Sequence, residues 1–121
     1  MNHAETKVYI HDWVCKYLYK KYDGGVLNRK FFDGKPAGEI DYYVVIDNTL
    51  RIYEVKATTS DKLDTRKKQY RKAKKQLIHG YKLLDDLDDV YNKVELYTAT
   101  VYSGRVKETL YKVIICNKEN L

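Results

Sequence analysis

Two acids and a lysine near the middle of the chain, Asp41, Glu54 and Lys56, are the residues whose types and spacing most suggest chemistry. They lie in two segments, 39–46 and 50–57, that are rich in Tyr, Val and Ile, residues that favour strands. A short polar pair separates the segments, as a two-residue hairpin loop requires. The sequence therefore predicts that the three side chains lie on one antiparallel hairpin.

The register of this hairpin decides whether the two acids meet. If Asp47-Asn48 forms the loop, Asp41 faces Glu54 with the Cβ atoms roughly 4.5–5.5 Å apart. Like charges that close cost stability, and a divalent cation offsets that cost, because Mg²⁺ prefers carboxylate oxygens and usually accepts one or two from a protein. Lys56 shares a strand face with Glu54, where its ammonium can orient an attacking water or stabilise charge on a transferring phosphoryl group.

The same residues also fit an arrangement without catalysis. In that alternative Asp41 and Glu54 are solvated, and Lys56 pairs with Glu39, which the register places opposite it. A hairpin loop one residue longer would also move Asp41 away from Glu54. Both alternatives stay open at the level of sequence.

Residues 64–84 are predicted to form a helix, because apolar residues recur there at spacings of three and four. The acidic run 85–89 is expected to close it, since carboxylates oppose the negative end of a helix. The predicted apolar stripe consists of Tyr70, Ala73, Leu77, Gly80, Tyr81 and Leu84.

Residues 66–75 within this helix hold seven basic side chains and no acid. Solvated helices usually alternate charges for mutual support, whereas seven like charges repel one another. A phosphate backbone would relieve that repulsion and release its counterions, and the alternative is a merely solvated basic face. The candidate nucleic-acid-binding residues are Arg66, Lys67, Lys68, Arg71, Lys72 and Lys75.

The remaining elements complete an α/β or α+β domain. A helix is predicted over 3–22, a strand over 26–32, a loop over 33–38, and a second hairpin of strands 93–102 and 106–115 across Ser103-Gly104-Arg105. The order αβββαββ predicts one domain, 1–121, with a central mixed sheet flanked by two helices. The apolar face of the first helix is predicted at Ala4, Val8, His11, Cys15, Leu18 and Tyr22, so His11 is expected to be a packed histidine.

Asp41, followed after twelve residues by Glu54-Val55-Lys56, resembles the signature of the PD-(D/E)XK nuclease superfamily. The superfamily's core order is αβββαβ, with the Asp on the second strand and E-x-K on the third, as in the strands predicted here. The resemblance covers roughly residues 4–100 and implies a restriction-endonuclease-like fold. Ile40 stands where the motif has Pro, and Gly38-Glu39-Ile40-Asp41 is similar to the form in Holliday-junction resolvases and related small nucleases.

The resemblance implies roles for individual residues. Asp41 and Glu54 would bind Mg²⁺, with Mn²⁺ able to replace it, and the backbone carbonyl of Val55 would add a ligand. Lys56 would position or activate the hydrolytic water. Many members carry a further acid on the first helix, and Glu5 is the match here, although an acid in a first helical turn is also explained by the helix dipole.

The second helix carries two glutamines that bear on the same site. Gln69 and Gln76 lie seven residues apart and hence on one side of the helix, where several branches of the superfamily place a Gln near the metal. Gln76-Leu77 with Tyr81 is similar to the Gln-Leu-x-x-Tyr pattern of the exonuclease-like branch, with one extra residue before the Tyr. Gln76 is the candidate site residue of the two.

Composition agrees with a polyanionic partner. The formal net charge is +6 and the pI about 9.1. Cys15 and Cys116 are expected to be semi-buried free thiols, and the three histidines lack metal-ligand spacing. No apolar run is long enough to span a membrane and residues 1–25 lack the core of a signal peptide, so a soluble intracellular protein is expected.

These observations predict a Mg²⁺-dependent deoxyribonuclease, an endonuclease acting on branched or otherwise structured DNA. The resemblance to small resolvases implies a homodimer, and RNA is an alternative partner that the residues leave open. One competing class is a non-catalytic nucleic-acid-binding domain that keeps the fold. Another is a protein-interaction module whose basic helix meets an acidic partner.

Overall fold

Helices and strands follow one another in the order αβββαββ in the computed structural model, which describes residues 2–57, 62–84 and 90–116. The boundaries lie within three residues of the predicted ones throughout, and the predicted helix closure at 85–89 lies outside the described residues. The elements are α1 (His3–Lys21), β1 (Val26–Phe32), β2 (Pro36–Ile46), β3 (Thr49–Lys56), α2 (Leu63–Leu83), β4 (Lys93–Tyr102) and β5 (Arg105–Ile115).

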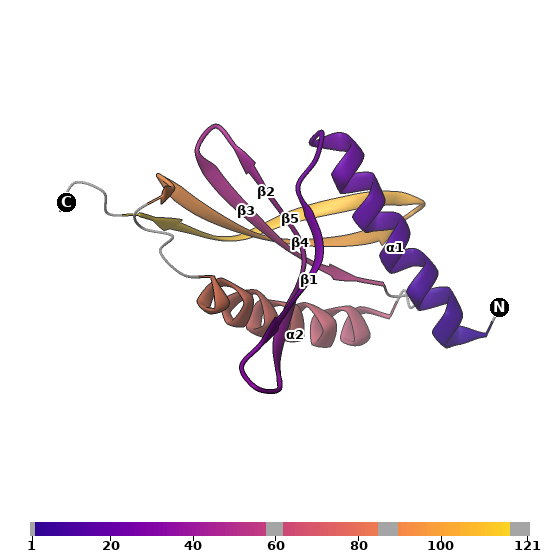
Figure 1. Ribbon diagram of the computed structural model, residues 1–121. Helices are drawn as coiled ribbons and strands as arrows, with labels where there is room; N and C mark the ends of the chain where they lie inside the picture. The colour runs from indigo at the N-terminus through magenta and orange to yellow at the C-terminus, as the bar shows by residue number, and fades with distance from the viewer. Residues whose placement is uncertain (1, 58–61, 85–89, 117–121) are drawn as a thin grey trace.

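The strands form one mixed sheet in the spatial order β1-β2-β3-β4-β5 (Figure 1). Neighbours are antiparallel except β3 and β4, which are parallel. A parallel pair needs a crossover connection, and α2 is part of it. The predicted α/β fold class with a mixed sheet is therefore confirmed.

Both hairpin loops follow from their residue types. Asp47 and Asn48 have φ values of 49° and 61°, the left-handed conformation that a two-residue type I′ loop requires at both positions. The predicted loop between β2 and β3 is therefore confirmed. Ser103 and Gly104 have φ values of 50° and 75°, and Tyr102 pairs with Arg105. The second loop thus has two residues, one fewer than predicted.

The predicted loop over 33–38 is wrong in its second half, because β2 begins at Pro36. Proline is tolerated at the first residue of a strand, where its missing N–H breaks no interior ladder bond. Gly38 then lies close under the end of α2, since a Cβ placed there would be 2.6 Å from Leu83 Cδ1. The glycine marks close packing between a strand and a helix here.

The sheet has an apolar core on each face, because side chains alternate along its strands. In β3, Tyr53 and Val55 join the core under α1, whereas Leu50 and Ile52 join the core under α2. Three residues of the predicted α2 stripe, Ala73, Leu77 and Gly80, are buried and the other three are half-buried. Figure 1 shows the sheet between the two helices.

The apolar face predicted for α1 is partly wrong. Val14, Cys15 and Leu18 are buried, but Ala4 is exposed and Val8 is 62% exposed. Figure 1 shows the first turns of α1 extending past the strands, which leaves their apolar side chains without a sheet to cover. Cys15 and Cys116 are buried free thiols, as the sequence predicts.

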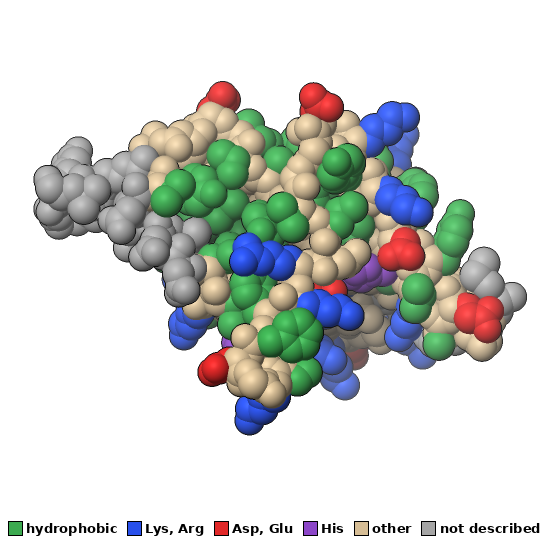
Figure 2. Space-filling view, in the orientation of Figure 1, with side chains coloured by type: hydrophobic (Ala, Val, Ile, Leu, Met, Phe, Trp, Pro, Cys, Tyr) green, Lys and Arg blue, Asp and Glu red, His purple; other side chains and the backbone are tan. Residues whose placement is uncertain are grey.

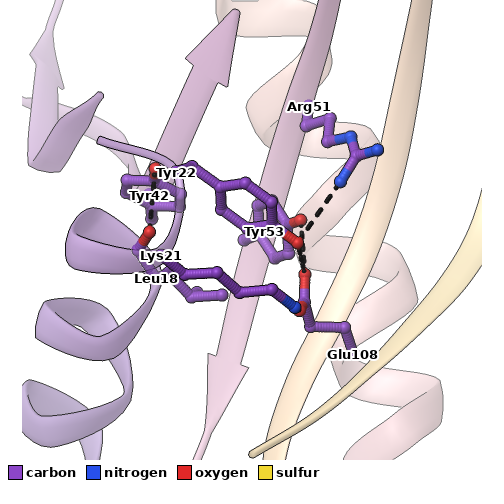
Figure 3. A network of polar contacts seen from close by, with 7 residues as sticks. All are labelled: Leu18, Lys21, Tyr22, Tyr42, Arg51, Tyr53 and Glu108. Atoms are coloured by element: carbon purple, nitrogen blue, oxygen red, sulfur yellow. Dashed lines mark hydrogen bonds and ion pairs between the residues drawn. The ribbon is translucent and has the colours of Figure 1, made fainter. Parts of the chain in front are cut away.

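A polar network joins the other end of α1 to the sheet (Figure 3). The Glu108 carboxylate of β5 accepts hydrogen bonds from Tyr22 and Tyr53 at 2.5 and 2.6 Å, and Lys21 lies 2.5 Å from its other oxygen. Arg51 donates to the Tyr22 hydroxyl at 3.3 Å. Glu108 therefore connects α1, β3 and β5 through charge-assisted hydrogen bonds.

Large hydrophobic side chains also reach the surface, and Figure 2 shows several on one face of the molecule. They include Tyr9, Trp13 and Tyr17 of α1 and Phe32 of β1. Trp13 and Tyr17 lie four residues apart on α1 with ring centroids separated by 6.3 Å, so their exposed rings form a small aromatic patch. Within the part of the chain that the structure describes, neither helix is long and apolar enough to cross a membrane.

Candidate active site

The paired part of the β2–β3 hairpin stops just before the two acids. The register from Ile46↔Thr49 to Tyr42↔Tyr53 is the predicted one. Beyond it Ile40 packs in the α2-side core while Tyr42 packs in the α1-side core, so β2 changes face at Asp41. The Asp41 carboxylate continues the contact between the strands, because its Oδ2 accepts the Val55 N–H at 2.8 Å.

Asp41 and Glu54 lie together, and both are buried, at 8% and 7% exposure. Burial first, and then the negative charge of Asp41, raise the pKa of Glu54 to about 8, although Lys56 opposes the shift. A hydrogen bond between the two carboxyl groups contributes in the same direction. The two carboxyl groups therefore meet, as predicted, although the regular pairing ends at Tyr42↔Tyr53 and does not include the predicted Asp41–Glu54 pair.

Lys56 is held between an acid and an amide. Its Nζ lies 3.3 Å from Glu54 Oε1 and donates to Gln76 Oε1 on α2. The alternative partner, Glu39, is exposed, and in the strand register it stands opposite Lys30 of β1. The structure therefore brings Gln76 to Lys56 and does not form the alternative pair.

His11 of α1 completes the cluster from the opposite side of the sheet. Its Nε2 lies 3.3 Å from Asp41 Oδ1 and its Nδ1 lies 3.7 Å from Cys15 Sγ. Hydrogen bonding to Asp41, followed by that to Cys15, raises the pKa of His11 to about 10, so the imidazole is cationic at neutral pH. The sequence-based expectation of a packed histidine missed this contact with Asp41. The only signal was a polar residue on an otherwise apolar stripe.

Glu5 is not part of the cluster. It lies in the first turn of α1, where its backbone N–H donates to Asn2 Oδ1 at 2.9 Å and its Oε1 accepts from Asn2 Nδ2 at 2.8 Å. This reciprocal pair caps the helix, a role typical of an acid at this position. The part of the chain that the structure describes contains no group of three or more His, Cys, Asp or Glu residues arranged to hold a metal.

The acid pair itself fits Mg²⁺, which takes one or two protein carboxylates and keeps several waters. Burial and then the charge of Asp41 raise the pKa of Glu54 even with Lys56 beside it, so a divalent cation between the two carboxylates would favour their charged forms. Val55, whose carbonyl is the further predicted ligand, follows Glu54 directly and is itself buried. The His11 imidazolium lies beside the same acid but has no lone pair to offer a metal.

A pocket of about 360 Å³ lies beside the cluster, between the two helices. His11, Val55 and Lys56 line it, so the predicted lysine has access to an open space. Gln69, the second glutamine on this side of α2, lines the same pocket. Its other lining residues are Lys7, Val8, Asp12 and Ala57.

The six basic candidates of α2 lie in three places. Four of the six candidates, Lys68, Arg71, Lys72 and Lys75, line a shallow hollow of about 770 Å³ together with Lys74, Ile78 and Tyr111. Lys67 is exposed outside that hollow. Arg66 instead lies towards the sheet, with its guanidinium carbon 5.0 Å from the centre of the Tyr102 ring.

No family model matches the chain, and no curated protein matches it at a significant level. Among solved structures, the crystal structure of SSO0001 is similar to the chain, with a TM-score of 0.43 and 18% sequence identity. The alignment covers 99% of this chain and 56% of the solved one, so the chain spans a little over half the length of that protein.

Proposed function

We propose that the chain is a Mg²⁺-dependent nuclease with a restriction-endonuclease-like PD-(D/E)XK core, and that it hydrolyses phosphodiester bonds in DNA. The observation that supports this most strongly is the meeting of Asp41, Glu54 and Lys56 at one end of the β2–β3 hairpin, with Lys56 oriented by Gln76. Two buried acids beside an oriented ammonium are unfavourable for the stability of the fold, but they are the groups that metal-dependent phosphoryl transfer uses.

Each residue has a separate part in this proposal. The carboxylates of Asp41 and Glu54, with the carbonyl of Val55, would hold Mg²⁺, which supplies Lewis-acid activation of the phosphate when bound. Lys56, fixed between Glu54 and Gln76, orients the attacking water and stabilises the charge that develops on the phosphoryl oxygens. Gln76 is a positioning residue, since its contact is with Lys56 rather than with substrate.

The cationic hollow on α2 supplies the binding surface. Five lysine and arginine side chains line it together with Ile78 and Tyr111, and none of its described lining residues is an acid. Such a surface attracts a phosphate backbone through counterion release, independently of base sequence. The preference for branched or structured DNA and the homodimer are part of the proposal and derive from the resemblance to small resolvases.

A second candidate function is DNA binding without cleavage, and the basic hollow alone would support it. The two are separated by incubating the purified chain with labelled single-stranded, duplex, flap and four-way DNA, with Mg²⁺ and then with excess chelator. The nuclease proposal expects cleavage with Mg²⁺ and none with chelator. Retarded but intact DNA under both conditions would leave only the binding function.

A further inference from the structure

The face of the sheet beneath α2 changes from apolar to polar along its parallel strands. In β3 the residues on this face run from Leu50 and Ile52 to Glu54 and Lys56, and in β4 they run from Val94 and Leu96 to Thr98 and Thr100. The apolar ends pack against Leu77 of α2. The polar ends are the carboxyl ends of the two strands, where ligands bind most often in sheets with parallel strands.

The strand register aligns these polar residues in two rows across the sheet. Glu54 pairs with Thr98, which pairs with Thr109 of β5. Lys56 pairs with Thr100, which pairs with Lys107 of β5. Each row therefore begins at a proposed active-site residue and continues over two strand spacings, roughly 10 Å, away from it.

A cavity of about 220 Å³ lies between these rows and the first half of α2. No acidic side chain is among the described residues that line it. Lys56 and Gln69 line both this cavity and the pocket beside His11, so the two spaces meet at the catalytic lysine. The cations and hydroxyls that line it are Lys56, Arg66, Lys107, Thr98, Thr100 and Thr109.

The cavity has the chemistry of a phosphate site more than that of a base-stacking site. Of its two aromatic residues, Tyr102 has the Arg66 guanidinium over its ring at 5.0 Å and Tyr70 has the Lys74 ammonium over its ring at 4.7 Å. Cations thus already lie against both rings, which disfavours stacking of a base there. Lysine, arginine and threonine hydroxyl groups are the usual donors to phosphate oxygens.

Among the described residues, one buried hydrogen-bond acceptor has no donor. Gln69 Oε1 is buried without a hydrogen-bond partner, and Gln69 lines this cavity. A buried unsatisfied acceptor costs free energy unless a ligand or a water donates to it. A protonated phosphate oxygen can donate that hydrogen bond, because a phosphate monoester has a pKa of about 6 and keeps its proton part of the time near neutral pH.

We propose that this cavity is a second phosphate site, which holds a phosphate group of the substrate strand close to, but separate from, the scissile one. The inference that the phosphate belongs to a substrate strand rests on the proposed nuclease function. The existence of the phosphate site does not depend on that function, because the cations and hydroxyls that form the site lie outside the acid pair. A terminal phosphate and an internal phosphodiester both offer anionic oxygens to its cations and threonine hydroxyls, but only the terminal monoester carries a proton for Gln69 Oε1 near neutral pH, and the two differ in which substrates they favour.

The site is tested first without nucleic acid. Inorganic phosphate is titrated into the wild-type protein in excess chelator, followed by ³¹P NMR, and the titration is repeated with Lys107→Ala, Thr100→Val and the matched control Lys112→Ala. Lys112 is also an exposed lysine of β5 but does not line the cavity. Lys107→Ala is expected to weaken phosphate binding about tenfold, because it removes a charge-assisted hydrogen bond. Equal binding by Lys107→Ala and Lys112→Ala overturns the proposal.

Cleavage with Mg²⁺ then identifies the source of the phosphate. The same proteins are given strands that end in a 5′-phosphate, a 3′-phosphate or hydroxyls, and a circular single strand. A preference for one phosphorylated end that Lys107→Ala abolishes supports a terminal phosphate. Uniformly slower cleavage of all strands by Lys107→Ala supports an internal one. Phosphate binding without any Mg²⁺-dependent cleavage overturns the nuclease function and leaves the phosphate site in place, whereas cleavage that Lys107→Ala does not alter overturns the site alone.

Discussion

The carboxylate of Asp41 accepts the backbone N–H of Val55 at 2.8 Å, so one side chain joins two strands at the point where their regular pairing ends. The same side chain stands beside Glu54 and His11. Asp41 Oδ2 therefore joins the strands, while Oδ1 faces His11. Substitutions that separate these two roles can be designed.

Replacing Asp41 by Asn or by Ala is expected to have the same effect on cleavage and different effects on stability. Both variants remove the carboxylate, so both should lose Mg²⁺-dependent cleavage. Only Asp41→Ala leaves the buried Val55 N–H without an acceptor, which costs about 1–3 kcal/mol relative to Asp41→Asn. Urea unfolding of both variants measures the difference. Equal stability of the two variants would show that the contact with Val55 contributes nothing to folding.

Glu54→Gln is expected to abolish cleavage while DNA affinity stays within about twofold of wild type, because the proposed phosphate contacts lie mainly on α2. Gln is uncharged and close in size to Glu, so it suits this buried position beside Asp41 and the fold should be kept. Cleavage is measured on labelled DNA with Mg²⁺, and affinity in chelator by fluorescence anisotropy. Glu39→Gln, at an exposed acid of β2, is the control and should cleave normally. Persistent cleavage by pure Glu54→Gln would remove Glu54 from the mechanism.

The first hairpin could be predicted from sequence because its information is local. Asp47 and Asn48 are residue types that tolerate positive φ, and once they form the loop the pairing from Ile46 to Tyr42 follows. That register predicted Asp41 close to Glu54, and the two acids do meet, although the regular pairing stops one residue before Asp41. The change of face at Asp41 could not be predicted, because it depends on the packing of Ile40 against α2.

Contacts of the site with α1 depend on how that helix lies across the sheet. Spacing along the helix shows which residues share a face, but not which turn lies over Asp41. His11 and Glu5 are less than two helical turns apart, and the docking of α1 brings His11 to the acid pair while Glu5 caps the helix. The α2 contacts were easier to predict, since Gln69 and Gln76 flank a strong apolar stripe that fixes the orientation of the helix.

Glu108→Ala is expected to destabilise the protein by about 1–3 kcal/mol near pH 7, because it removes the acceptor of two tyrosine hydroxyls and the partner of Lys21. Burial alone would raise the pKa of Glu108, but the hydrogen bonds from Lys21, Tyr22 and Tyr53 outweigh it and lower the pKa. A lowered pKa means that the stabilisation is complete above the pKa of the unfolded chain and is lost as the pH falls through that of the folded protein.

The destabilisation caused by Glu108→Ala should therefore shrink as the pH is lowered from 7 towards about 3. Chemical unfolding of wild type and variant at several pH values measures it, with Glu39→Ala as the control for an exposed acid. A difference that stays constant over this range would show that the charge of Glu108 is not what stabilises the network in Figure 3.

The hollow on α2 predicts how DNA binding depends on salt. Lys72 and Lys75 are exposed, line the hollow and belong to the acid-free run. The double variant Lys72→Ala/Lys75→Ala should weaken DNA binding for all sequences alike and reduce the slope of log K against log salt by about 1.8, because each phosphate contact contributes roughly 0.9 on duplex DNA. Anisotropy titrations between low and moderate salt, in chelator, give the slope. The matched control is Lys16→Ala/Lys20→Ala, which removes two exposed lysines of α1 and the same net charge. If both double variants lower the slope equally, the effect comes from overall charge, and α2 is not the DNA-contacting surface.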